Sequence, residues 1–271
     1  MIEALVYLLA ISVAEYITAY YITVQPIWGI TLHILILVTI IVRSALDSHP
    51  TRQQFFLSLA LAPLVRVVSL TMPLANIPRL MWYPLIYAPL MAAAILSVRI
   101  MNIKARELGV SPRLPSVKLT VSLPGIPSHP VFSLPAPVLQ FAIIPLTGFI
   151  FGIAEHLILQ EKPLVDQFTL EAIWLPALVL LFSTGVVEEF IFRGVMQQTA
   201  WREFGWRGII YVSFLFAILH LGFRSWLDVG FVFAVAMFFA WIVKRTGSLL
   251  GVTLAHGITN IMLYLVTPFF F

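Results

Sequence analysis

Two adjacent acidic residues and one basic residue interrupt a long apolar stretch of the sequence, TGVVEEFIFRGV. They are Glu188, Glu189 and Arg193. Residues four apart share one face of a helix, so Glu189 can pair with Arg193, and acid before base is the favourable order. On a helix of 3.6 residues per turn, Glu188 is turned by about 100° from Glu189. We therefore expect Glu188 to point into a cavity, while Glu189 is neutralised by Arg193.

Two later apolar stretches each carry a histidine. The sequence FAILH contains Phe216 and His220, and HGITN contains His256 and Asn260. His256 and Asn260 are four residues apart, so both side chains project from one helix face. We expect Phe216 to pack beneath His220. Charged and strongly polar side chains are costly inside a membrane and by default mark a functional site.

These residue types can activate water. A carboxylate and an imidazole around one water molecule make a general-base site, and Glu188 is the candidate base. Water activated in this way attacks an amide carbonyl, and the ring of His256 and the amide of Asn260 can donate hydrogen bonds to the resulting oxyanion. Two alternatives stay open. Glu188, His220 and His256 also form a suitable zinc set with water in the fourth position, and Asn260 can simply bridge two helices. We expect a metal-free site, because the ligands are few and an asparagine suits an oxyanion better than zinc.

Other hydrolytic chemistries lack their residues in this chain. There is no cysteine, which excludes a cysteine nucleophile, thiolate metal sites and disulfides. The HExxH and GxSxG motifs are also absent. The aspartates Asp47, Asp166 and Asp228 all fall outside the apolar spans predicted below. We therefore expect no pair of catalytic aspartates within the membrane.

The composition indicates an integral membrane protein. Of 271 residues, 61% are hydrophobic and 10% are charged, whereas soluble domains carry roughly 25% charged residues. A helix needs about 20 apolar residues to cross the hydrocarbon core, and the sequence predicts nine spans. They lie near 2–24, 27–43, 55–75, 82–101, 138–159, 174–200, 208–222, 229–243 and 248–267. The predicted fold class is all-α, a polytopic bundle of transmembrane helices.

The distribution of basic residues predicts the orientation. The connections after the even-numbered spans hold most of them, whereas the odd-numbered connections hold only Arg79, Lys162 and Arg224. By the positive-inside rule, the even-numbered connections and the N-terminus are cytosolic.

Three of the candidate site residues are predicted to lie at one depth. Counted from the cytosolic face at 1.5 Å per residue, Glu188, His220 and His256 lie at about 21, 20 and 17 Å. We expect them to line one polar cavity with Asn260, reached from the cytosolic side, with roughly 3 to 6 Å between neighbouring functional atoms.

EExxxR, FxxxH and HxxxN, in this order on separate apolar helices, resemble the three-part motif of the CAAX-protease and bacteriocin-processing family (CPBP, or Abi), which includes the type II CAAX prenyl endopeptidases. The matching residues are Glu188, Glu189, Arg193, Phe216, His220, His256 and Asn260. The resemblance covers about 174–267 and implies an intramembrane endopeptidase. It further implies that Glu188 and His220 hold the water and that His256 and Asn260 are the oxyanion donors. Many relatives are labelled metalloproteases, and prokaryotic members are assigned to bacteriocin processing or self-immunity.

The chain is predicted to have two regions. Residues 1–137 comprise the N-terminal spans and a proline-rich connection, and residues 138–271 form the C-terminal bundle with the catalytic core. Within the connection 102–137, the stretch Val117 to Leu123 alternates apolar and polar residues, which predicts a small surface hairpin. In the N-terminal spans, Glu15 and Arg66 lie at similar depths, and we expect a structural ion pair between them.

The first functional hypothesis is an endopeptidase in a prokaryotic plasma membrane. Its expected partners are the lipid bilayer and a hydrophobic or lipidated peptide of CAAX-like or bacteriocin type, cut near its C-terminus, with no nucleic acid and no cofactor. The alternatives are a proton-coupled transporter and a non-catalytic membrane scaffold. A proton relay should string ionisable groups through the membrane, whereas these cluster at one level, and the sequence shows no internal repeat of the kind that transporters often have.

Overall fold

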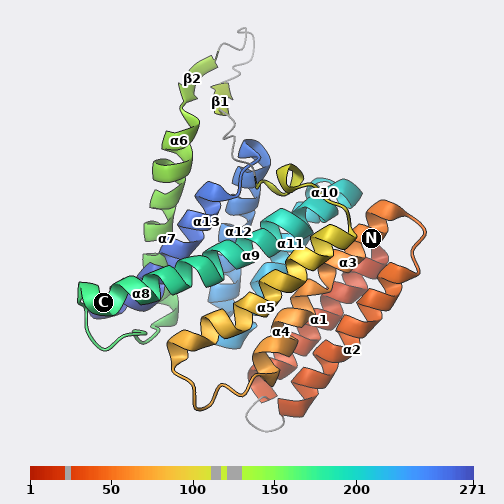
Figure 1. Ribbon diagram of the computed structural model, residues 1–271, viewed down its shortest axis with the longest axis horizontal. Coiled ribbons are helices and arrows are strands. Elements are labelled where there is room, and N and C mark those ends of the chain that lie inside the picture. Colours follow the sequence, from red (N-terminus) through yellow and green to blue (C-terminus); the bar gives the residue numbers. More distant parts are fainter. Residues whose placement is uncertain (22–25, 111–116, 121–129) are drawn as a thin grey trace.

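The computed structural model describes residues 1–21, 26–110, 117–120 and 130–271. Within these ranges it is a bundle of long helices from which one two-stranded hairpin projects (Figure 1). The described residues include nine helical segments long and apolar enough to cross a membrane, which confirms the all-α class and the predicted number of spans. These segments are Ile2–Tyr21, Ile27–Ala45, Pro50–Thr71, Arg79–Ile100, Ala136–Leu159, Leu170–Phe204, Trp206–Phe223, Trp226–Thr246 and Leu250–Phe269.

The N-terminal part is built from five α-helices that lie together in Figure 1, followed by one 3₁₀ turn. Their bounds are α1 Ile2–Tyr21, α2 Pro26–Ala45, α3 Pro50–Leu59, α4 Leu61–Thr71, α5 Arg79–Ile100 and η1 Ala105–Leu108. The third span is broken between α3 and α4 because Pro63 has no N–H to donate to the carbonyl of Leu59. The Tyr7 hydroxyl donates to that carbonyl at 2.6 Å instead. A neighbouring helix thus satisfies a backbone group that lipid cannot.

The connection between α5 and the C-terminal helices carries the hairpin. Strands β1 (Val117–Thr120) and β2 (Pro130–Leu134) pair antiparallel. The predicted hairpin therefore has its first strand at the expected place, while residues 121–123 of that prediction lie outside the described residues.

The C-terminal part contains the remaining helices, several of which have wide π-helical turns. Its elements are α6 Ala136–Val138, η2 Leu139–Ile143, α7 Ile144–Leu159, α8 Leu170–Leu180, η3 Leu181–Val186, α9 Val187–Glu189, η4 Phe190–Met196, α10 Gln197–Phe204, α11 Trp206–Ile218, η5 Leu219–Phe223, α12 Trp226–Thr246, α13 Leu250–Ile261, η6 Met262–Val266 and η7 Thr267–Phe269. The predicted division of the chain near residue 137 stays a prediction. Helix α5 of the first half packs directly against η3 and η4 of the second half.

The sixth span changes its helical geometry where its charged residues lie. The π-helical segments η3 and η4 flank the short α9 that carries Glu188 and Glu189. Such π turns are rare and are frequent at functional sites, because the wider turn redirects side chains. Here they redirect the polar side chains of one span.

Helices α7 and α13 approach each other closely through two glycines. Gly148 and Gly152 are four residues apart on α7, the small-xxx-small spacing that lets membrane helices pack tightly. A Cβ at Gly148 would overlap the carbonyl oxygen of Ala255, and one at Gly152 would lie 2.5 Å from the carbonyl oxygen of Thr259. Both contacts involve residues adjacent to His256 or Asn260, so this packing sets the position of the helix that carries them.

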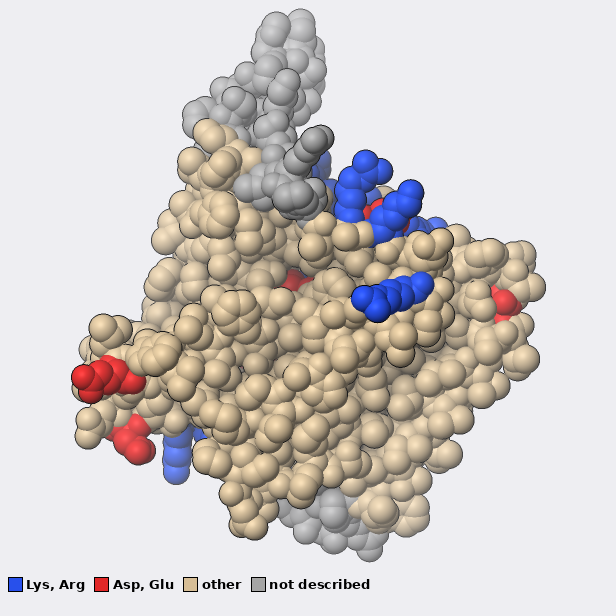
Figure 2. Space-filling model, viewed as in Figure 1, with Lys and Arg blue, Asp and Glu red and all other residues tan. Residues whose placement is uncertain are grey.

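The even-numbered connections lie at one end of the bundle. Arg202, near the end of the sixth span, pairs with Glu107 at 2.7 Å and donates to the side chain of Gln54 at 3.2 Å. The N–H of Leu249, after the eighth span, donates to the carbonyl of Gly109 at 3.1 Å. On the face shown in Figure 2, most of the visible lysines and arginines gather over η1, the end of α5 and α10. That this end is cytosolic stays a prediction.

One sequence-based placement is wrong. Asp228 was expected outside the spans, but α12 begins at Trp226, and Asp228 is fully buried within the eighth span. The extra turn forms because the Ser225 side chain caps the helix by accepting from the N–H of Asp228 at 3.1 Å. The other two aspartates lie outside the helical segments that could cross a membrane, so the described spans hold no pair of aspartates.

Candidate active site

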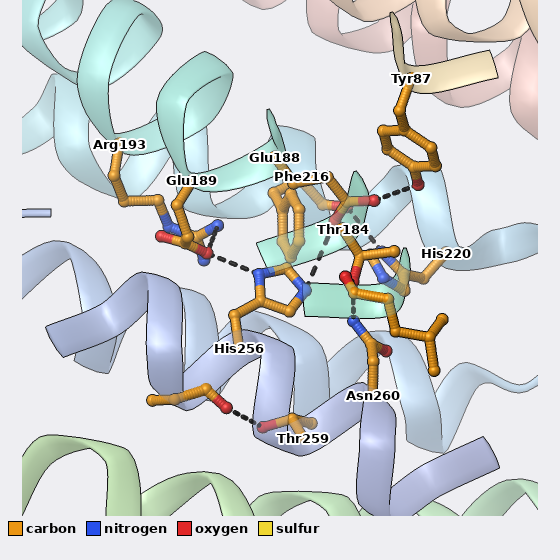
Figure 3. A network of polar contacts seen from close by, with 12 residues as sticks. Tyr87, Thr184, Glu188, Glu189, Arg193, Phe216, His220, His256, Thr259 and Asn260 are labelled. Carbon is orange, nitrogen blue, oxygen red and sulfur yellow. Dashed lines mark hydrogen bonds and ion pairs between the residues drawn. The ribbon is translucent and has the colours of Figure 1, made fainter. Parts of the chain in front are cut away.

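One cavity collects the predicted site residues. Glu188, His220, His256 and Asn260 all line it, although they come from three separate spans, and its volume is about 270 Å³. Figure 3 shows these side chains converging from α9, η5 and α13. The convergence expected from their common depth is therefore present in the fold.

Glu188 is held from two sides. The Tyr87 hydroxyl, on α5, donates to its Oε1, and Nε2 of His256 lies 3.5 Å from its Oε2. Its side chain is 17% exposed, on the cavity wall. One carboxylate oxygen is thus fixed by the N-terminal helices, while the other faces the histidine.

Glu189 turns away from the cavity, as the 100° offset predicts, and joins two of the other residues. Its Oε1 accepts from Arg193 at 2.9 Å and from Nδ1 of His256 at 2.7 Å. Glu189 has no exposed surface. The pairing with Arg193 was expected from the spacing, but the contact with His256 was not, because it joins helices 67 residues apart. Since a carboxylate only accepts, Nδ1 of His256 carries a proton.

The orientation of His220 follows from its own helix. Its Nδ1 lies 3.0 Å from the carbonyl oxygen of Phe216, which can only accept, so Nδ1 is the protonated nitrogen and Nε2 of the neutral ring is free to accept a hydrogen bond. The Phe216 ring packs against His220 in a tilted arrangement, with 4.8 Å between ring centroids. It also lies 4.4 Å from the Arg193 guanidinium and packs edge-on to His256 at 6.1 Å. Phe216 therefore packs against both histidines and the arginine.

Asn260 bridges two helices, the alternative role that the sequence left open for it. Its Nδ2 donates to the Thr184 hydroxyl on η3 at 2.8 Å. Thr184 passes its own hydrogen to the carbonyl of Leu180 at 2.6 Å, so its oxygen is oriented to accept. The amide of Asn260 has a second hydrogen, and the residue lines the cavity. The bridge fixes the side chain without using all of its donors.

The N-terminal helices supply an ion pair beside this cavity. Arg66 Nε donates to both carboxylate oxygens of Glu15, at 2.7 and 2.9 Å, so the predicted contact is present. His33 Nε2 lies 3.5 Å from the same carboxylate, and His33 is fully buried. Arg66 also donates to the carbonyl of Leu219, the residue before His220, and it lines the cavity.

The sequence did not place several residues in the cavity wall, including Arg66, which was expected only in the ion pair with Glu15. Tyr87, Thr184, Arg66 and Glu155 all line the wall. Glu155, on α7, is 7% exposed, and no hydrogen bond joins its side chain to another described residue. A glutamate within an apolar span is a signal that sequence reasoning could have used. Tyr87 and Thr184 carry no such signal, because tyrosine and threonine are ordinary in membrane helices.

The side chains do not fit the alternative zinc site. Among the described residues, no group of three or more histidine and acidic side chains is arranged to hold a metal ion. The hydrogen bonds of Nδ1 in His256 and His220 do not disfavour a metal, because a histidine that binds zinc through Nε2 commonly donates its other ring N–H to a carboxylate or a carbonyl. The metal-free chemistry expected from the sequence stays a proposal.

The comparison with protein families adds an independent line of evidence. Residues 170–262 match the family model described as type II CAAX prenyl endopeptidase, Rce1-like. This segment is similar to that family. The match includes every residue of the three motifs and confirms the resemblance drawn from them. Neither the comparison with curated proteins nor that with solved structures gives a match.

The family match indicates which kind of reaction the cavity serves. An Rce1-like segment within nine apolar helices points to an integral membrane protease of the CAAX type. The N-terminal helices and α7 lie outside the matched segment. They nevertheless contribute Tyr87, Arg66 and Glu155 to the wall of the same cavity.

Proposed function

We propose that the protein is an intramembrane endopeptidase that cuts hydrophobic or lipid-anchored peptides near their C-terminus. The observation that carries this proposal is the convergence of Glu188, His220, His256 and Asn260 on one cavity, within an Rce1-like segment. The same family match favours a protease over a proton-coupled transporter or a non-catalytic scaffold.

The first step is the activation of water. One water molecule donates one hydrogen to the Glu188 carboxylate and the other to Nε2 of His220, which is available because Nδ1 is bonded to the Phe216 carbonyl. Glu188 removes a proton, and the hydroxyl oxygen adds to the carbonyl carbon of the peptide bond. Tyr87 assists by fixing Oε1 of Glu188.

The oxyanion that forms is stabilised by His256 and Asn260. Asn260 donates the amide hydrogen that Thr184 does not use. His256 donates from Nε2, which requires the protonated ring because Nδ1–H is bonded to Glu189. The negative charge of Glu189 stabilises that imidazolium, in the way that a buried carboxylate supports a catalytic histidine. Donors held in place before the reaction are the ones that lower its barrier most.

The second step releases the products. Glu188, now protonated, gives its proton to the nitrogen of the scissile bond as the carbon–nitrogen bond breaks. One water molecule is consumed, and the products are a new carboxyl terminus and a free amine. Substrate enters laterally from the side that carries the basic connections, which we take as cytosolic in a prokaryotic plasma membrane.

The deciding experiment compares two glutamate variants of the full chain reconstituted in liposomes, with hydrophobic reporter peptides as substrates. Glu188→Gln keeps the size and the hydrogen bonds of the side chain but removes its basicity, so kcat is expected to fall by about 10² or more. Glu171→Gln is the matched control, because Glu171 is exposed in the first turn of α8 in the same span. Near-normal cleavage by Glu188→Gln in a folded protein would make the base assignment wrong.

A further inference from the structure

Arg66 brings a positive charge to the active-site cavity from outside the family segment. It lies on α4, and it is the only lysine or arginine among the described residues that line the cavity. Its side chain is 21% exposed. A cation at membrane depth is costly and is retained where it pairs with a charge or binds one. Its pairing explains how it is tolerated, but not why it faces the cavity.

The guanidinium is held so that part of it stays available. Nε donates to Glu15, which is 1% exposed and is not among the residues of the cavity wall, and Nη2 donates to the carbonyl of Leu219. A guanidinium has five N–H donors, and these contacts use two. Nη1 makes no hydrogen bond to another described residue. Because it is also not one of the buried atoms without a partner, it keeps some exposed surface. The counter-ion thus lies behind the arginine, and its remaining donors face open space.

We propose that Arg66 binds the C-terminal carboxylate of the peptide substrate. This inference rests on the proposed endopeptidase function and names the end of the chain that the enzyme recognises. A guanidinium presents paired N–H groups that match a carboxylate, and such charge-assisted bonds are the strong ones inside a protein. Glu188 and Glu155 line the same cavity and repel an anion. The carboxylate is therefore directed to Arg66.

The size of the cavity then limits the length of the released fragment. Arg66 bonds to Leu219, so the anchor lies next to the turn that carries His220. Arg66 and Glu188 line one cavity of about 270 Å³, so only a few residues of extended chain, at about 3.3–3.6 Å each, fit between the anchor and the base. A substrate anchored at Arg66 is cut within a few residues of its end.

The test uses two reporter peptides of one sequence, one ending in a free carboxylate and the other in a carboxamide. The full chain in liposomes is assayed for kcat/KM on both, and the Kd of each is measured with Glu188→Gln, which binds the peptide but cleaves it slowly. We expect wild type to prefer the carboxylate by about tenfold or more, as for a hydrogen bond to a charged group. This wild-type comparison needs no variant at Arg66.

Two variants separate anchoring from structural support. Glu15→Gln/Arg66→Gln removes both charges together, and its preference is expected to fall to about one. Arg224→Gln is the matched control, because Arg224 holds the end of the same turn through the Ala19 carbonyl at 2.7 Å but does not line the cavity. It should retain the preference even if both rates fall.

The outcomes decide between the two proposals. Equal kcat/KM and equal Kd for the two peptides with wild type and Glu188→Gln, or a preference that survives in the double variant, would overturn the assignment of Arg66. If wild type cleaves neither peptide, the proposed function fails, and the two Kd values alone decide whether Arg66 binds a carboxylate.

Discussion

The C-terminal segment 170–262 and the N-terminal helices α1 to α5 line the same cavity, but they differ in how their residues reach it. The C-terminal segment places its polar residues in local pairs four apart, such as Glu189 with Arg193 and His256 with Asn260. The N-terminal helices contribute Tyr87 and Arg66, which belong to no motif and reach the site only through tertiary packing.

The residues proposed to react are therefore different from the residues that position them. The proposed base, water ligand and oxyanion donors all lie in the matched segment, whereas the N-terminal helices hold one oxygen of Glu188 and one carbonyl beside His220. Substitutions in the first group should act on the chemical step. Substitutions in the second should have smaller effects, on orientation and on the choice of substrate.

Beyond the proposed base Glu188, the largest expected effect comes from Glu189, within the matched segment. Glu189→Gln retains an oxygen that accepts from Nδ1 of His256 but loses the charge that stabilises the imidazolium, and it leaves Arg193 without its counter-ion. We expect kcat to fall by about 10²-fold, the size seen when one oxyanion donor is lost, with KM nearly unchanged. Steady-state cleavage of the reporter peptide measures both. A variant within twofold of wild type would show that the charge on Glu189 has no part in the reaction.

A smaller effect is expected at the contact between α7 and α13, which lies between the two groups. In Gly152→Ala the new Cβ meets the carbonyl oxygen of Thr259 at 2.5 Å, so the two helices must separate. Overpacking of this kind costs about 1–3 kcal/mol of stability, and activity should fall severalfold because Asn260 moves with α13.

The matched control is Gly230→Ala on α12, where a Cβ would meet nothing within 4 Å. Thermal unfolding in detergent should show a lower midpoint for Gly152→Ala only. Equal midpoints for the two variants would mean that the close approach of α7 and α13 does not set stability.

The sequence predicts the parts of this molecule that depend on local spacing and on polarity. The spans follow from the length of apolar runs, and the grouping of Glu188, His220 and His256 follows from equal depth in a membrane. Asp228 was misplaced because one capping serine extends α12 by a turn, a detail that hydropathy does not report.

Long-range contacts were not predictable in the same way. Tyr87 donates a hydrogen bond to Glu188, 101 residues away in the sequence. Thr184 accepts one from Asn260, 76 residues away. Nothing local marks either residue, because each is defined only by the way in which two helices pack. The pairing of Glu15 with Arg66 was predictable because two opposite charges at one depth in a membrane have few other partners.

A second effect smaller than that of Glu189 is expected at Tyr87, in the N-terminal helices. Tyr87→Phe removes the hydroxyl that fixes Oε1 of Glu188 and leaves the ring in place. Without this bond the carboxylate samples other orientations, and fewer of them direct Oε2 towards water. A hydrogen bond to a charged group contributes about 1.5–3 kcal/mol, so a loss of kcat of about tenfold or more is expected. Tyr83→Phe is the matched control, because Tyr83 lies one turn earlier on α5, lines the same cavity and has no hydrogen bond to Glu188. Single-turnover cleavage of the reporter peptide isolates this step. An equal loss in both variants would indicate a general effect of cavity hydroxyls, and no loss in Tyr87→Phe would mean that the matched segment orients its base alone.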